Sequence, residues 1–214
     1  MIATRGGGRI HADSGYALAA VLVVAGCATV TENTLSQTKR DALRIDSIEV
    51  TLAPNGFVNW ASAWGEYATM KQNGQMPSAA SAGYADEKQY ANQKAIGIIQ
   101  KNLNAKILPQ FRGTDAAILK VNLKQVTIPH AIQTILIGGD HVVRAHVQLV
   151  DKQTGAVLLN VDDFNGLVGG PGGFPQVVVE AFMPEPIERV SNSFANALAQ
   201  WMKTGSALAS SRQS

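Results

Sequence analysis

The strongest constraint on the fold is a segment, residues 141–150, in which apolar side chains recur at every second position. A period of two is typical of a strand that buries one face. The inward positions would be Val143, Ala145, Val147 and Leu149. The residues Asp151-Lys-Gln-Thr-Gly155 follow and have the composition of a hairpin turn, after which residues 156–161 would pair back. Residues 117–123 alternate in the same way, so the sequence predicts a three-stranded antiparallel meander.

Two longer segments show the period of an amphipathic helix instead. Residues 86–107 carry an apolar stripe, and Pro109 would stop this helix. Pro186 would open a final helix and Gly205 would close it. The two stripes comprise Ile96, Ile99, Leu103 and Ile107, and Ile187, Val190, Phe194, Leu198 and Trp201. Each helix therefore has a single face to bury.

One more strand is expected near the start of the domain. Residues 44–52 alternate, and the turn residues Pro54-Asn55-Gly56 would end the strand. Residues 177–182 are apolar and fit either a helix or a strand. The economical packing is an α+β fold, an antiparallel sheet of about four strands with two or three amphipathic helices packed on one face.

Four aromatic residues lie close together after the first expected strand. Their spacings of three, four and three would place them all on one face of a helix: Phe57, Trp60, Trp64 and Tyr67. Such a stripe is either the buried face of an ordinary helix or a binding surface for a partner protein, a lipid headgroup or a sugar. A short helix buries one ring more easily than four. We therefore expect one of Trp60 and Trp64 to lie in the core and the other at the surface.

The N-terminal region has the pattern of a signal peptide. Arg5 and Arg9 precede an unbroken run of small and aliphatic residues, 17–26, which is shorter than the about 20 apolar residues of a membrane-spanning helix. The run ends in Leu22-Val-Val-Ala-Gly-Cys27, which resembles a bacterial lipobox. The resemblance implies cleavage before Cys27 and the addition of lipid, such as palmitate, to this cysteine. The lipid would tether the chain to a membrane.

The residue after the cysteine bears on the destination of a lipoprotein. In lipoproteins of enteric bacteria, an aspartate at this position retains the protein in the inner membrane, whereas this chain has Ala28. The resemblance therefore implies an outer-membrane protein that faces the periplasm. Cys27 is the single cysteine of the chain, which argues against a disulfide framework.

The domain itself resembles proteobacterial lipoprotein families of unknown function. The resemblance rests on residues 117–155, which include Gly138-Gly-Asp-His141 and the Asp151 to Gly155 turn, and on the glycine-rich connection 166–173. These motifs are mainly turn residues. The order of elements is also similar to that of small periplasmic domains in accessory lipoproteins of secretion, curli export and cell-wall synthesis, which is an analogy of fold alone.

No catalytic signature occurs in the sequence. It lacks a Gly-x-Ser-x-Gly elbow, a His-Glu-x-x-His helix and a phosphate loop. His141 and His146 are five residues apart and would lie on opposite faces of a strand, so no metal site is expected. The net charge is +2 and gives no electrostatic reason to bind nucleic acid. We expect no enzyme activity, no cofactor and no nucleic-acid partner.

These observations together predict an organisation and a role. We expect a signal peptide over residues 1–26, a lipidated tether over 27–42, a single periplasmic domain over 43–204 and a flexible tail over 205–214. The expected role is that of a non-catalytic accessory or scaffold component of an envelope assembly, which binds a partner protein. A lipid- or glycan-binding module is the alternative. The candidate residues are Cys27 for lipidation and Phe57, Trp60, Trp64 and Tyr67 for partner or ligand binding.

Overall fold

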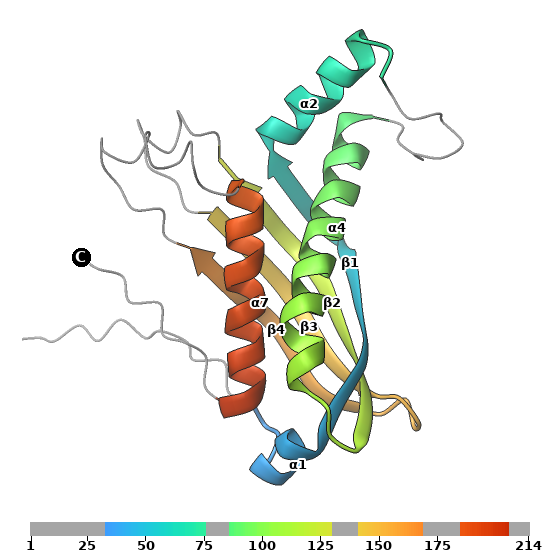
Figure 1. The fold of residues 1–214 in the computed structure, drawn as a ribbon, viewed down its shortest axis with the longest axis vertical. Coiled ribbons are helices and arrows are strands. Elements are labelled where there is room, and N and C mark those ends of the chain that lie inside the picture. The colour runs from blue at the N-terminus through green and yellow to red at the C-terminus, as the bar shows by residue number, and fades with distance from the viewer. Residues whose placement is uncertain (1–32, 76–85, 130–140, 169–184, 206–214) are drawn as a thin grey trace, which may run out of the picture.

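A four-stranded sheet carries the fold, and two long helices, α4 and α7, lie side by side on one of its faces (Figure 1). The structure, a computed structural model, describes residues 33–75, 86–129, 141–168 and 185–205. In chain order the elements are α1 (Gln37–Ala42), β1 (Leu43–Trp60), α2 (Ala61–Gln72), α4 (Glu87–Ile107), the 3₁₀ turn η1 (Leu108–Gln110), β2 (Asp115–Ile128), β3 (His141–Asp151), β4 (Val157–Val168) and α7 (Pro186–Thr204).

The pairing of the strands confirms the α+β class and corrects the predicted strand directions in the sheet. Strands β2, β3 and β4 form the antiparallel meander that the alternation predicts. The strand order is β1-β2-β3-β4, and β1 pairs with β2 in parallel, so the sheet is mixed rather than wholly antiparallel. A parallel neighbour needs a long crossover connection. The segment that contains α2 and α4 provides it.

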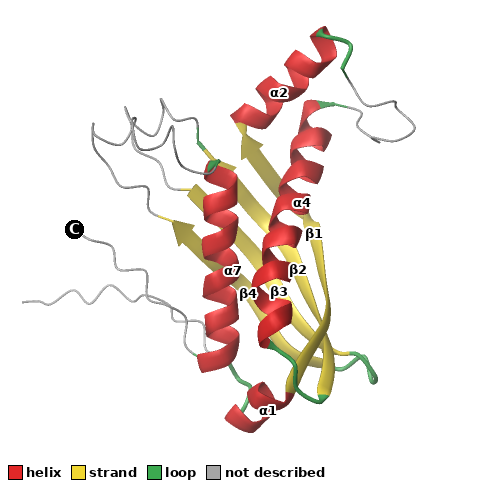
Figure 2. Ribbon diagram, in the orientation of Figure 1, coloured by secondary structure: helices red, strands yellow, loops and turns green. Residues whose placement is uncertain are grey.

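The core lies between the sheet and the two helices, which Figure 2 shows in front of the strands. All four inward positions predicted for β3 are fully buried. The stripe of α7 is fully buried along its whole length, from Ile187 to Trp201, as are Ile99, Leu103 and Ile107 of α4. Helix α4 packs against β1, and α7 packs against β4 and β3. The burial of these stripes supplies most of the stability of such a domain, because burial of apolar surface is the dominant favourable term in folding.

The opposite face of the sheet carries polar side chains. Asn160 on β4 accepts a hydrogen bond from Gln148 at 2.9 Å and lies 2.6 Å from Nε2 of His146. Arg144 forms an ion pair with Asp163 on the same two strands. An antiparallel sheet commonly has one face on the core and one face in water. The expected separation of the two histidines is confirmed, because His141 is buried and His146 lies on this polar face.

Strand β1 runs further than the sequence predicts. The residues Pro54-Asn55-Gly56 do not end it but form an irregularity, in which β1 advances from Leu52 to Phe57 while β2 advances only from Leu123 to Gln125. A side-chain carbon at Gly56 would collide with the carbonyl oxygen of Leu123. Glycine therefore allows the two backbones to approach closely at this point, and the strand resumes beyond it.

The ends of the two long helices agree with the sequence prediction. Asp86 caps α4 by accepting the N–H of Gln89 at 2.8 Å, and Gly205 ends α7 with a left-handed φ of 82°. Residues 37–42, which the sequence assigns to the lipidated tether, form α1, which Ser36 caps. Cys27, the lipobox, residues 177–182 and the tail beyond Gly205 lie outside the described residues. No helix among those described has the length and hydrophobicity to cross a membrane.

The β3–β4 turn allows a test of the hairpin. Gly155 has a φ of 72°, and its N–H donates to the carbonyl of Asp151 at 2.9 Å. Open space surrounds the position, so Gly155→Val would suffer backbone strain without a clash. We expect a loss of about 1 to 2 kcal/mol of stability in chemical denaturation. The matched variant Gly97→Ala on α4 should instead gain about 0.5 to 1 kcal/mol, because alanine is the better helix former. Equal stability of the Gly155 variant and wild type would contradict the turn geometry.

Candidate functional site

The four candidate aromatic residues do not share one helical face. Phe57 and Trp60 belong to strand β1, whereas Trp64 and Tyr67 belong to helix α2, which starts only at Ala61. The prediction of a single helical stripe is therefore wrong. The reason is that β1 continues beyond Gly56, so the first two rings follow the alternation of a strand. Trp60 points into the core with 2% of its surface exposed, whereas Phe57 on the other face is 51% exposed.

Two of the four rings form part of an internal cluster that joins α2 to α4. Tyr67 is 6% exposed, and its ring lies 5.6 Å from that of Tyr90 on α4. The ammonium group of Lys94 lies 5.2 Å from the ring centroid of Trp60 and 5.8 Å from that of Tyr90. Both distances are within the range of cation–π attraction. Trp60 and Tyr67 are therefore structural residues, as the core interpretation of the stripe predicts.

A carboxylate completes this cluster. Glu66 forms an ion pair with Lys94 and accepts a hydrogen bond from the hydroxyl of Tyr90 at 2.7 Å. Partial burial alone would raise the pKa of Glu66, but the hydrogen bonds from Lys94 and Tyr90 outweigh it, and the pKa lies below its ordinary value. Glu66 is thus a carboxylate at neutral pH. Its negative charge holds the ammonium group of Lys94 between α2 and α4.

The other two rings remain at or near the surface. Phe57 is one of two large hydrophobic residues that are exposed within the described part of the chain, the second being Val157. Trp64 is half-buried and packs against the core, and its indole N–H is buried without a hydrogen-bond partner among the described residues. A buried donor without an acceptor lowers the stability of the folded state. Of the four candidates, Phe57 is the one whose ring is most available to a partner.

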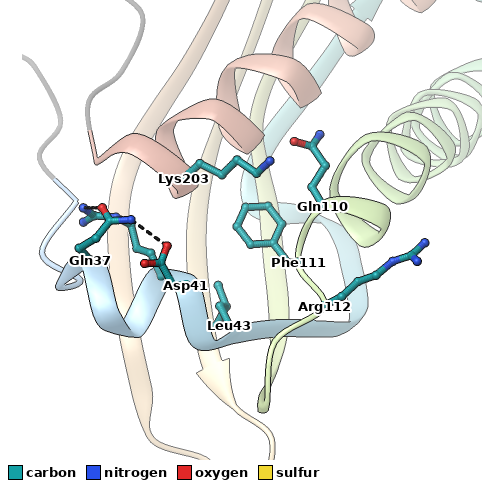
Figure 3. Close-up of a pocket in the computed structure, with 8 residues that line it drawn as sticks. Gln37, Asp41, Leu43, Gln110, Phe111, Arg112 and Lys203 are labelled. Atoms are coloured by element: carbon teal, nitrogen blue, oxygen red, sulfur yellow. Dashed lines mark hydrogen bonds between the residues drawn. The ribbon is translucent and has the colours of Figure 1, made fainter.

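A pocket of about 370 Å³ lies at the other end of the sheet, where α1, η1 and the last turn of α7 meet (Figure 3). Its apolar residues, Leu43 and Phe111, are each 3% exposed. Lys203 and Gln110 extend toward one another above the Phe111 ring, and Arg112 extends outward (Figure 3). The lining residues are Gln37, Arg40, Asp41, Leu43, Gln110, Phe111, Arg112 and Lys203.

Positive charge predominates in this pocket. Arg40, Arg112 and Lys203 line it together with one carboxylate, Asp41, which already accepts a hydrogen bond from Gln37 at 2.7 Å. None of the three cations forms an ion pair within the described part of the chain. The pocket is thus complementary to an anion rather than to a metal ion. No group of three or more His, Cys, Asp or Glu side chains that could hold a metal occurs among the described residues.

The backbone around the pocket is held in place on two sides. Residues 111–113 pair with the start of β1, since Ile45 donates to the carbonyl of Phe111 at 3.1 Å and Gly113 donates to that of Leu43 at 2.9 Å. On the other side, the N-terminal segment is fixed to the end of α7. Asn33 donates from its backbone to Gly205 at 3.3 Å and from its side chain to Trp201 at 3.2 Å. The pocket is therefore part of the rigid domain.

Arg40 connects these two sides. Its guanidinium donates to the carbonyl of Leu35 and, at 2.7 Å, to the side-chain oxygen of Gln37. A side-chain carbon at Gly205 would lie 3.2 Å from Nη1, so the cation sits beside the C-terminus of α7, where the helix dipole favours positive charge. Its Nε–H is buried and has no partner among the described residues. Arg40 therefore retains a donor for a further acceptor.

This pocket was not predicted from the sequence. Arg40 lies far from Arg112 in the chain, and both lie far from Lys203, so no local pattern connects the three cations. They meet only because α1 leads into β1, because residues 111–113 pair with the start of β1, and because α7 ends at the same edge. The one available signal was Lys203 in the last turn of a predicted helix, which is common for reasons unrelated to binding.

Neither a protein-family model nor a curated protein matches the chain. Solved structures that resemble it include a candidate lipoprotein from Caulobacter crescentus CB15, at 15% identity and a TM-score of 0.30, over 52% of this chain and 82% of that one. The PelC dodecamer from Paraburkholderia phytofirmans is 13% identical with a TM-score of 0.30, over 78% and 96%. Lipoprotein GNA1162 from Neisseria meningitidis is 16% identical with a TM-score of 0.23, over 64% and 94%. Lipoproteins are thus among the structures similar to this one, but likeness at this level carries no argument about function.

Proposed function

We propose that this protein is a lipid-anchored lipoprotein of the bacterial envelope that acts by binding, as an accessory or scaffold component of an assembly. Its lipid would be attached to Cys27, and its domain would face the periplasm from the outer membrane. The proposal assigns the α1 end of the domain to the membrane and the α2 end to a partner protein. It involves no catalytic step and no cofactor.

The observation that carries this proposal is the separation of the two ends. Asn33 is bonded to the last turn of α7, at the end of the sheet where α1 lies. Helix α2 and Phe57 lie at the opposite end, as Figure 1 shows for α1 and α2. Strand β1 connects the two ends over 18 residues, or on the order of 50 Å at about 3.3 Å per residue, allowing for its irregularity. A domain anchored near Asn33 would present α2 away from the membrane.

The α2 end also has the chemistry of a contact surface. Phe57 offers an exposed aromatic ring, the kind of residue that is enriched at the centres of protein interfaces. The cluster of Trp60, Tyr67, Tyr90 and Lys94 fixes α2 to α4, so that a partner would meet a surface that is already ordered. A preformed surface loses less conformational entropy on binding.

Site-specific crosslinking in intact cells tests the assignment of the two ends. A photoreactive amino acid would replace Phe57 in one variant and Val157 in another, since these residues are 51% and 55% exposed and lie at opposite ends of the sheet. We expect a discrete protein adduct from position 57 and none of that mass from position 157. Equal adducts from both positions, or none from position 57, would contradict the proposal. A co-purifying lipid or sugar in place of a protein adduct would favour the alternative of a lipid- or glycan-binding module.

A further inference from the structure

The pocket at the α1 end has a charge pattern that the scaffold role does not explain. Three cations line it against one carboxylate, and no ion pair within the described residues neutralises any of the three. Two neighbouring cations at this end are paired: Lys39 lies 3.1 Å from Asp115 and Lys152 lies 2.8 Å from Asp46. Single cations without an ion pair also occur elsewhere among the described residues, such as Lys71, Lys88 and Lys106. The pocket differs from these positions because three unpaired cations line one hollow.

We propose that this pocket binds the phosphate group of an anionic phospholipid in the membrane to which the protein is anchored. The proposal rests on the proposed function, because it requires the α1 end to face a membrane. Arg40 and Lys203 would contact the phosphate oxygens, since a guanidinium and an ammonium are the usual partners of phosphate. Arg112 would lie at the rim, where it extends outward in Figure 3.

The length of the tether places the pocket within reach of the lipid headgroups. Five residues separate Cys27 from Asn33, so the fixed end of the domain can be no more than about 20 Å from the acylated residue. A site held this close to a surface meets its ligand at a high effective concentration. A weak headgroup site therefore suffices to hold the domain in one orientation, with α2 pointing away from the membrane.

The apolar residues of the pocket form its floor. Leu43 and Phe111 are each 3% exposed, and the backbone carbonyl of each accepts a hydrogen bond that holds it in place. They fix the shape of the pocket but offer little apolar surface to a ligand. The preference for a lipid headgroup over free phosphate therefore comes from the tether, which holds the pocket close to the membrane.

Photocrosslinking with lipids in reconstituted vesicles tests the proposal. The lipidated full-length protein would be placed in phosphatidylcholine vesicles that contain either photoreactive phosphatidylglycerol or photoreactive phosphatidylcholine. We expect phosphatidylglycerol to label peptides that contain residues 37–43 and 110–112, and phosphatidylcholine to leave them unlabelled. Mass spectrometry of the peptides reads out the position and the yield. Equal labelling by the two lipids would overturn the proposal.

Two double variants distinguish an effect of the pocket on lipid labelling from an effect of the overall charge of the protein. A cation near an anionic membrane typically strengthens binding about fivefold. The double variant Arg112→Gln with Lys203→Gln should therefore reduce phosphatidylglycerol labelling at least fivefold. Both residues are exposed, so the melting temperature should not change. Lys71→Gln with Lys88→Gln at the α2 end removes the same charge from exposed positions and should leave labelling intact. Equal losses in the two double variants would overturn the pocket as the site.

Competition with free phosphate and the mass of the purified protein separate the two ways in which the proposal can fail. If inorganic phosphate in the buffer abolished the labelling, the site would take free phosphate, and the lipid assignment would be overturned. The mass of the purified protein before reconstitution shows whether Cys27 carries an acyl chain. A protein without one would contradict the proposed function. A lipidated protein that labels equally with both lipids would fail the pocket proposal alone.

Discussion

Replacing Trp60 with alanine is expected to lower the free energy of unfolding by about 3 to 5 kcal/mol, because the change removes a large ring from the core. Trp60 is 2% exposed and ends the edge strand β1, and the ammonium of Lys94 lies 5.2 Å from its ring centroid. Loss of the ring would leave a cavity at the point where β1 meets α2 and α4. Because a domain of this size is stable by only about 5 to 15 kcal/mol, the variant should unfold at a much lower denaturant concentration.

Trp64→Ala is the matched comparison, since it removes the same ring four residues later. Trp64 is half-buried, and its indole N–H has no partner among the described residues. Removal of this ring also removes a buried unpaired donor, so the expected cost is only about 1 kcal/mol. Chemical denaturation of the two variants side by side measures the difference. Equal losses of stability would contradict the placement of the Trp60 ring in the core.

Replacing Cys27 with serine is expected to abolish the attachment of lipid and to remove the mature, membrane-bound form of the protein. The expectation follows from the lipobox pattern and from Cys27 being the single cysteine of the chain. Two or three acyl chains bury enough methylene groups to anchor a protein durably, whereas one gives only marginal binding. Metabolic labelling with a palmitate analogue, followed by membrane fractionation, measures both effects.

Ala28→Asp is a control that keeps the acylated cysteine. In enteric lipoproteins an aspartate at this position retains the protein in the inner membrane, so this variant should keep its acyl label and move from the outer to the inner membrane in an enteric host. The label would thus be lost in one variant and only redistributed in the other. Membrane fractionation that showed the Cys27→Ser protein unchanged would contradict the anchor.

Local patterning predicted most of the elements of this fold. The alternation of β3 is set by a buried face, and all four of its inward positions are fully buried. The stripe of α7 and its end at Gly205 were predictable for the same reason, since stripes and caps depend on neighbouring residues. These features require only the physical chemistry of a short segment.

Features that depend on contacts between distant segments were not predictable in this way. Periodicity shows that residues 44–52 form a strand, but it carries no information about the partner or direction, and β1 pairs in parallel with β2. Pro54-Asn55-Gly56 has turn composition, yet Gly56 allows close approach to the backbone of Leu123, and the strand continues. The assignment of Phe57 and Trp60 to a helix failed for this reason alone.

The two candidate sites differ in the same respect. The four aromatic candidates at residues 57–67 were found from sequence because they are neighbours in the chain. Only the fold distinguishes exposed Phe57 from buried Trp60. The cationic pocket was not found, because Arg40, Arg112 and Lys203 come together from three separate parts of the chain. Charge alone does not mark such residues, since isolated surface cations are common.

The most direct measurement of the central claim is the mass of the N-terminal peptide of the protein extracted from membranes. A lipid-anchored envelope protein should begin at Cys27, with a diacylglyceryl group on the sulfur and an acyl chain on the new amino group. Tandem mass spectrometry locates both groups on that residue. An N-terminal peptide that keeps residues before Cys27, or that begins there with an unmodified sulfur, would contradict the account.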